Sequence, residues 1–229
     1  MNKIYQTQII QTLISEKQYL NYEYVIPIIR LIGNFIFISD EYLDIMIKLG
    51  CIPIMENLLK DSCLQVRKES CWAISNITSG TKEHLSNIIK NTKIISLLVD
   101  ILRNENNYFL KKEAMYAITN ACVNALEFEL YVDLVKDKVL DVLNDNLNLK
   151  TDPFFIDSSM SALKSILKSG EIIKKVNKVN PFAKKFEEIG GVSRLEQFQK
   201  YHNTTIYEKA VILIEMFFNR NRGNDIFGY

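Results

Sequence analysis

Apolar residues recur at helical spacing along most of the chain, and the helical segments that they predict follow a repeating order. Two shorter helices precede a longer one, and each round takes about 42–45 residues. We expect a partial round over 5–38, rounds over 40–80, 81–124, 126–169 and 172–218, and a flexible tail over 219–229. Such rounds are typical of stacked helical repeats, in which each repeat buries its apolar face against its neighbours.

Polar and helix-breaking residues predict where individual helices begin and end. Asp40 is expected to cap the helix that follows it, and Gly50 to end that helix. Pro153 suits the first position of a long helix over about 152–167. The first helix of the last round is then expected over 172–189.

One phrase on the predicted long helices returns in altered form. It reads KESCWAISNITSG at 68–80, KEAMYAITN at 112–120 and IRLIGN at 29–34. The residue four places before each asparagine shares that asparagine's helix face. These pairs are Trp72 with Asn76, Tyr116 with Asn120, and Arg30 with Asn34. The asparagines are 42 and 44 positions apart, a spacing typical of armadillo and HEAT repeats.

Composition favours helices and excludes several classes of protein. The 229 residues include only 8 Gly and 4 Pro, and 48% are hydrophobic. The formal net charge of +1 favours neither nucleic acid nor a membrane surface as partner. No secretory signal and no run of about 18 apolar residues is present. The four cysteines form no CxxC pair, which indicates reduced, structural thiols in the cytoplasm or nucleus.

Catalytic and cofactor chemistry has no support in the sequence. The two histidines, His84 and His202, have no metal-ligating partner nearby in sequence, and we expect both to be surface residues. The chain has no phosphate-binding glycine loop, nucleophile elbow or HExxH motif. The most basic stretch, 168–185, contains six lysines and is interpreted as a solvated face, with contact to nucleic acid or to an acidic partner as the alternative. We therefore predict neither enzyme activity, nor a metal, nor a cofactor.

The repeated phrases resemble the importin alpha family, which binds nuclear localisation signals. The copies at 29–34, 68–80 and 112–120 resemble its sixth, seventh and eighth armadillo repeats, and 182–218 resembles the tenth. The resemblance implies an all-α, right-handed superhelical solenoid of armadillo repeats. It also implies that the importin-beta-binding segment and the first five repeats are absent. The remaining repeats would correspond to the minor signal-binding site and to the region used by the export receptor.

A basic peptide bound in the predicted groove would need three kinds of contact. Asn34, Asn76 and Asn120 offer amides to its extended backbone. Trp72 and Tyr116 offer aromatic faces to its Lys and Arg side chains. Glu69 and Glu113 lie three residues before these aromatic residues and supply negative charge. Asp40 is a further acid outside this register, and Arg30 would repel a cation; in the family this arginine separates the two signal-binding sites.

Several positions depart from the family pattern, and they predict weak binding by this chain alone. Tyr116 replaces a tryptophan, and tyrosine is the poorer cation platform. Ser161 and Ser165 occupy the Trp and Asn places of the ninth repeat. Phe37 and Ile38 replace the usual Thr-Gly and would crowd a peptide backbone.

The leading hypothesis is a nuclear import adaptor-like protein of the cytoplasm and nucleus that binds nuclear localisation signals. One alternative is a truncated armadillo scaffold that has lost cargo transport and docks a partner through its apolar N-terminal edge or its last repeat. Another is a helical-repeat enzyme acting on nucleic acid, which would need a basic inner face and a catalytic acid. Acidic residues beside the aromatic residues favour the first hypothesis.

Overall fold

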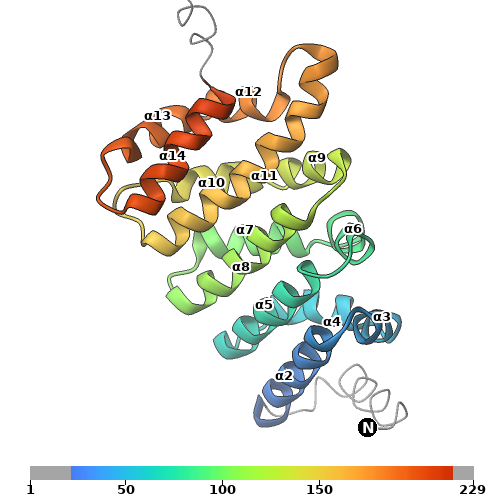
Figure 1. The fold of residues 1–229 in the computed structure, drawn as a ribbon. Coiled ribbons are helices and arrows are strands. Elements are labelled where there is room, and N and C mark those ends of the chain that lie inside the picture. Colours follow the sequence, from blue (N-terminus) through green and yellow to red (C-terminus); the bar gives the residue numbers. More distant parts are fainter. Residues whose placement is uncertain (1–21, 219–229) are drawn as a thin grey trace, which may run out of the picture. The chain divides into compact units, whose positions relative to one another are not determined.

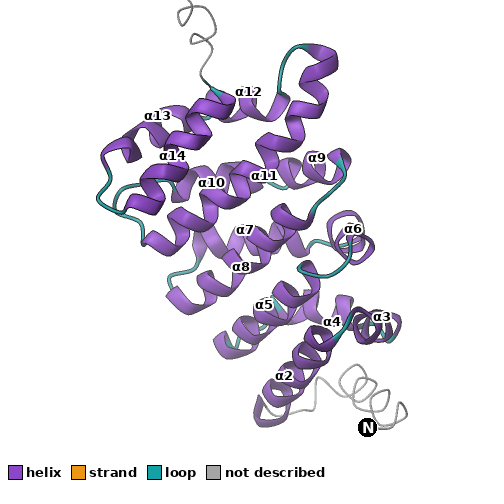
Figure 2. Ribbon diagram, viewed as in Figure 1, coloured by secondary structure: helices purple, strands orange, loops and turns teal. Residues whose placement is uncertain are grey.

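The structure is a computed structural model, and it describes residues 22–218. All regular elements in this range are helices (Figure 1, Figure 2). In chain order they are α2 (Tyr22–Ile38), α3 (Asp40–Lys48), α4 (Cys51–Leu58), α5 (Leu64–Thr78), α6 (Lys82–Asn91), α7 (Ile94–Asn104), α8 (Tyr108–Asn124), α9 (Phe128–Lys136), α10 (Val139–Asn146), α11 (Pro153–Asn177), α12 (Pro181–Glu188), α13 (Gly191–Gln197), the 3-10 helix η2 (Phe198–Lys200) and α14 (Thr204–Phe217). The helix predicted over residues 5–15 lies outside the described residues.

The chain divides into two compact units, Met1–Val139 and Leu140–Tyr229. In the first unit α5 packs between α2 and α8, and α7 packs against α8. In the second unit α11 packs against α12 and α14, and α13 packs against α14. The helices follow the order of two short helices and one long helix from α3 onward.

Small side chains let the long helices of the first unit approach one another closely. On α5, Ala73 and Ser75 are buried, and on α8 Ala114, Ala117 and Ala121 are completely buried. Larger apolar side chains such as Ile74 fill the space between them. A helix with neighbours on two sides needs apolar or small residues on both, so α5 and α8 lack the single apolar stripe of a surface helix.

The helix that follows α2 is capped one residue earlier than predicted. The hydroxyl of Ser39, in extended backbone, accepts a bond from the Tyr42 N–H at 3.4 Å. Asp40 is therefore the first residue of α3, where its negative charge favours the positive end of the helix dipole. Gly50 ends this helix as predicted, with φ of 86° and its N–H bonded to the Ile47 carbonyl at 2.9 Å.

The prediction for α11 was wrong at its C-terminal end, and with it the helix expected over 172–189. α11 continues to Asn177, and Lys178, with φ of 59°, ends it. Gly170 lies inside this helix because the Asn180 amide packs where a side chain would be; a Cβ on Gly170 would lie 2.1 Å from Asn180 Oδ1. Asn180 then caps α12, with its Oδ1 accepting from the Phe182 N–H at 3.1 Å.

His84 is buried, which contradicts the expectation of a surface histidine. Its Nε2 lies 2.8 Å from Asp44 Oδ1, 40 residues earlier, and its Nδ1 accepts from the Thr81 N–H. The Asp44 carboxylate has a lowered pKa because of this hydrogen bond, which outweighs its partial desolvation. The pair joins α3 to α6 and so ties the first helices of two successive rounds.

The cysteines are free thiols, and three of them are buried. Burial raises the pKa of Cys51 and of Cys122 to about 12, and it also raises the pKa of Cys71. A thiol with so high a pKa is a poor nucleophile and packs as a small apolar group.

Candidate functional site

The long helices α2, α5 and α8 place eight of the nine predicted site residues in neighbouring rows within the first unit. We call this surface the third-helix face; it comprises Arg30 and Asn34 on α2, Glu69, Trp72 and Asn76 on α5, and Glu113, Tyr116 and Asn120 on α8. The ninth residue, Asp40, is exposed in the first turn of α3 and does not belong to this face.

The asparagines of α5 and α8 each donate a hydrogen bond to the preceding long helix. Asn76 Nδ2 donates to the Gly33 carbonyl at 3.1 Å, and Asn120 Nδ2 donates to the Ser75 carbonyl at 3.0 Å. Each acceptor is the residue just before the asparagine of the earlier helix, so the stagger is the same at both contacts. Every amide keeps a second N–H and its carbonyl oxygen for another partner.

Trp72 packs against the backbone of α2. A Cβ on Gly33 would lie 2.3 Å from the Cζ3 atom of the indole, so only glycine leaves room for the ring. The ring is half-buried, and Tyr116, its counterpart on α8, is 42% exposed. Gly33 thus positions two side chains of α5. Its carbonyl accepts the hydrogen bond from Asn76, and the absence of a side chain leaves space for the ring of Trp72.

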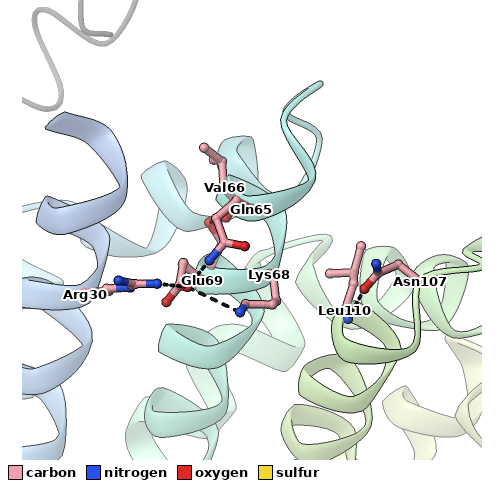
Figure 3. A network of polar contacts seen from close by, with 8 residues as sticks. Arg30, Gln65, Val66, Lys68, Glu69, Asn107 and Leu110 are labelled. Atoms are coloured by element: carbon pink, nitrogen blue, oxygen red, sulfur yellow. Dashed lines mark hydrogen bonds and ion pairs between the residues drawn. The ribbon is translucent and has the colours of Figure 1, made fainter. Parts of the chain in front are cut away.

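Glu69 already has partners within the protein (Figure 3). Its Oε1 accepts from Arg30 Nη2 at 2.7 Å and from Gln65 Nε2 at 2.6 Å, and Lys68 Nζ lies 3.6 Å away. Burial by itself would raise the pKa of this carboxyl, but the bonds and charges of Arg30 and Lys68 outweigh burial and lower the pKa. Glu69 is therefore an ionised, neutralised group in the unliganded protein.

Glu113 has a different environment, although it holds the same place on α8. The carboxylate is half-buried, and it forms no hydrogen bond or ion pair with the residues of the described range. Burial raises its pKa; the charge of Glu69 acts in the same direction, while Lys68 and Lys112 oppose it. An incompletely compensated carboxylate beside Tyr116 is suited to a ligand cation.

The second unit replaces the aromatic and asparagine pair with an internal contact. Lys209 Nζ, on α14, donates to Asp157 Oδ1 at 2.6 Å and to Ser161 Oγ at 2.9 Å, both on α11. Ser161, in the tryptophan place of the predicted ninth repeat, thus serves the packing of α11 on α14. The role of Lys209 is not predictable from the local sequence, because its partners lie 48 and 52 residues earlier.

Gly33, Gln65 and Lys68 were also missed, and one of them had a signal in the sequence. Gly33, Ser75 and Thr119 each directly precede an asparagine of the repeated phrase, so a small residue recurs in that register. Gln65 and Lys68 gave no comparable pattern. Within 22–218 no cluster of three metal-ligating side chains is found, and no helix there is long and apolar enough to cross a membrane.

Comparisons with known proteins identify the repeats of this chain. Residues 39–79 match the model of the armadillo/beta-catenin-like repeat, and residues 180–226 match that of the atypical Arm repeat. Importin subunit alpha-1a of Oryza sativa subsp. japonica is 32% identical over 84% of this chain and 36% of its own length. Importin subunit alpha-4 of Arabidopsis thaliana is 34% identical over 66% of this chain and 28% of its own length. The chain thus spans about a third of these relatives.

Solved structures show the same fold. An engineered protein superimposes with a TM-score of 0.76 at 22% identity, covering 91% of this chain and 46% of that one. A designed armadillo repeat protein in complex with the peptide (KR)4 gives a TM-score of 0.64 at 23% identity, covering 92% of this chain and 98% of that one. These matches confirm the predicted all-α solenoid. The chain is an armadillo-repeat protein related to the importin alpha subunits.

Proposed function

We propose that this chain is a nuclear import adaptor-like protein that binds short basic peptides of the nuclear localisation signal type on its third-helix face. The observation that carries the proposal is the half-buried, incompletely compensated Glu113 carboxylate, which lies on the same helix as Tyr116 and next to the helix of Trp72. A cation accepted there would restore the charge balance that burial disturbs.

The asparagine row supports an extended peptide rather than a small cation. Asn76 and Asn120 are held in equal stagger by their bonds to the preceding helix, and each keeps amide groups free for a peptide backbone. Trp72 and Tyr116 offer apolar faces to the methylene chains of lysine or arginine and attract their charged ends. The three kinds of contact predicted for a basic peptide thus come together on α5 and α8.

The length of the binding region is limited on the α2 side. Arg30 forms an ion pair with the Glu69 carboxylate, which is then not available to a ligand cation. Phe37, beyond Asn34, is 76% exposed and would crowd a peptide backbone there. We infer that only the part of the face formed by α5 and α8 engages a peptide strongly, so that binding is weak. A single short site also lacks the gain in effective concentration that a two-site signal provides.

Titration of the purified protein with a Lys-Arg-rich peptide tests this function. Trp72 is the only tryptophan, so its fluorescence reports the face directly. Calorimetry with Trp72→Ala and Asn76→Ala should show weaker binding, whereas Asn104→Ala, an exposed asparagine at the end of α7, should bind as the wild type. If the fluorescence showed no saturable change, or if all variants bound the peptide equally, the proposal would fail. The alternative of an armadillo scaffold that does not bind cargo would then be favoured.

The same proposal places the protein in the cytoplasm and the nucleus, where such signals are presented. A tagged copy expressed in cells should distribute between both compartments. Retention of the tagged copy in only one of them would contradict this part of the proposal.

A further inference from the structure

A second candidate surface lies in the second unit, at the C-terminal end of α11. Here α11, α12 and α14 line a pocket of about 420 Å³, which we call the lysine pocket. Its lysines are Lys174, Lys178 and Lys184, and its apolar residues include Val179, Ala183 and Met216. None of these residues takes part in the third-helix face.

The lysine pocket has more positive charge than its own residues neutralise. Lys174 pairs with Glu171 on the same helix, at 3.1 Å. Lys178 and Lys184 form no ion pair within the described range, and Glu187 is the one acid among the pocket's lining residues. On the third-helix face, by contrast, the group without an ion pair among the described residues is an acid, Glu113.

Apolar side chains are exposed at the same place. Val179 is 49% exposed and Met216 is 52% exposed, and Val176, the next-to-last residue of α11, is 80% exposed. Single exposed apolar residues are ordinary, but a group beside a pocket favours a partner that covers it. The extension of α11 past residue 167, which the sequence did not predict, is what brings Val176 and Val179 there.

We propose that the lysine pocket binds a short acidic segment of a partner protein that carries an apolar side chain. Carboxylates of the segment would pair with Lys178 and Lys184, and the apolar side chain would cover Val179, Ala183 and Met216. The exposed apolar residues favour such a segment over nucleic acid, which would leave them uncovered. The overall charge of +1 also gives a polyanion no long-range attraction.

Fluorescence anisotropy with a labelled peptide of alternating Asp and Leu tests this proposal on the full chain. Saturable binding is expected, with about a tenfold loss of affinity for the double variant Lys178→Glu and Lys184→Glu. The matched control, Lys90→Glu with Lys150→Glu, makes the same charge change at exposed positions elsewhere and should bind as the wild type. Met216→Ser should also weaken binding, which charge alone would not explain.

The proposal would be overturned by no saturable binding, by an equal loss in both double variants, or by equal binding of an all-Asp peptide. Stronger binding of a single-stranded oligonucleotide than of the peptide would also reject it. Circular dichroism melting of each variant separates lost binding from lost folding. Titration with the basic peptide should be unaffected by Lys178→Glu with Lys184→Glu, so failure here is distinguishable from failure of the proposed function.

Discussion

The side-chain amide of Asn76 donates to the backbone carbonyl of Gly33 on the neighbouring long helix, at 3.1 Å. The same relation joins Asn120 to Ser75, at 3.0 Å. Asn76 and Asn120 thus each use one N–H to fix the stagger of adjacent helices, and under the proposed function the rest of each amide would bind the peptide backbone. Substitutions in the row should accordingly affect stability as well as binding.

Asn76→Ala should lower the free energy of unfolding by about 1 kcal/mol, because the hydrogen bond to the Gly33 carbonyl is lost. Urea denaturation followed by circular dichroism measures this change. Asn104→Ala, at an exposed helix end, is the control and should be within about 0.5 kcal/mol of the wild type. Equal stability of the Asn76 variant and the wild type would show that the bond contributes nothing to the array.

Gly33→Ala should destabilise the protein by about 1–3 kcal/mol, as overpacking does, because its Cβ would collide with the rigid indole of Trp72. The tryptophan emission should shift as the ring moves. In a Trp72→Leu background the same glycine substitution should cost much less, and a double-mutant cycle measures that coupling. Additive effects of the two substitutions would contradict the contact.

Glu113→Gln should stabilise the unliganded protein and weaken peptide binding. The folded pKa of Glu113 is raised above its unfolded value of about 4.3. Its ionisation is therefore unfavourable to the fold at neutral pH, and this cost disappears as the pH falls below both values. Thermal melting at pH 7 and at pH 4 should show a stabilising effect that is larger at pH 7. A variant that is less stable at pH 7 would indicate a partner for Glu113.

Arg30→Ala should strengthen the binding of a Lys-Arg-rich peptide several-fold, because it exposes the Glu69 carboxylate and removes a repelling charge. The pKa of Glu69 should rise at the same time, because the hydrogen bond and the charge of Arg30 are the largest of the effects that lower it. Adding Glu69→Gln should cancel the gain in affinity. Weaker binding by Arg30→Ala would mean that the arginine itself contacts the ligand.

Asp44→Ala should lower the free energy of unfolding at neutral pH but not in acid, where the wild type has already lost the contribution of this carboxylate. The folded pKa of Asp44 is lowered by the bond to His84, so its contribution is present above the unfolded carboxyl pKa of about 3.9 and is lost as the pH falls through the lowered value. Urea denaturation between pH 3 and pH 7 should show the two proteins converging at the acid end. Asp145→Ala, an exposed acid on α10, provides a comparison.

Local sequence patterns predicted the helices and the direction of their side chains, since both depend on residues a few positions apart. The shared face of Trp72 and Asn76 is an example. The partners of those side chains were not predictable in the same way, because Arg30 and Glu69 are 39 residues apart and His84 and Asp44 are 40 apart. Such pairs depend on how far neighbouring helices are shifted along one another, and a short sequence motif does not indicate that shift.

The end of α11 shows how a distant contact can override a local signal. Glycine within a helix is unfavourable, and the long helix predicted from the sequence ended near residue 167, before Gly170. The side chain of Asn180 fills the space beside Gly170 and donates to the Leu167 carbonyl at 2.8 Å, so the helix continues. Tertiary packing therefore decided where α11 ends.

The bonds from Asn76 and Asn120 have a consequence for the assembly of the array from repeats. Neither hydrogen bond depends on the side chain of its acceptor residue, because the acceptor is a backbone carbonyl and every amino acid has one. These two bonds therefore set no requirement on the side chain of the acceptor residue, whereas the ring of Trp72 does require glycine at position 33. The asparagine bonds are thus the interchangeable part of each joint between repeats, and the fit of Trp72 beside Gly33 is the part that is specific to one pair of helices.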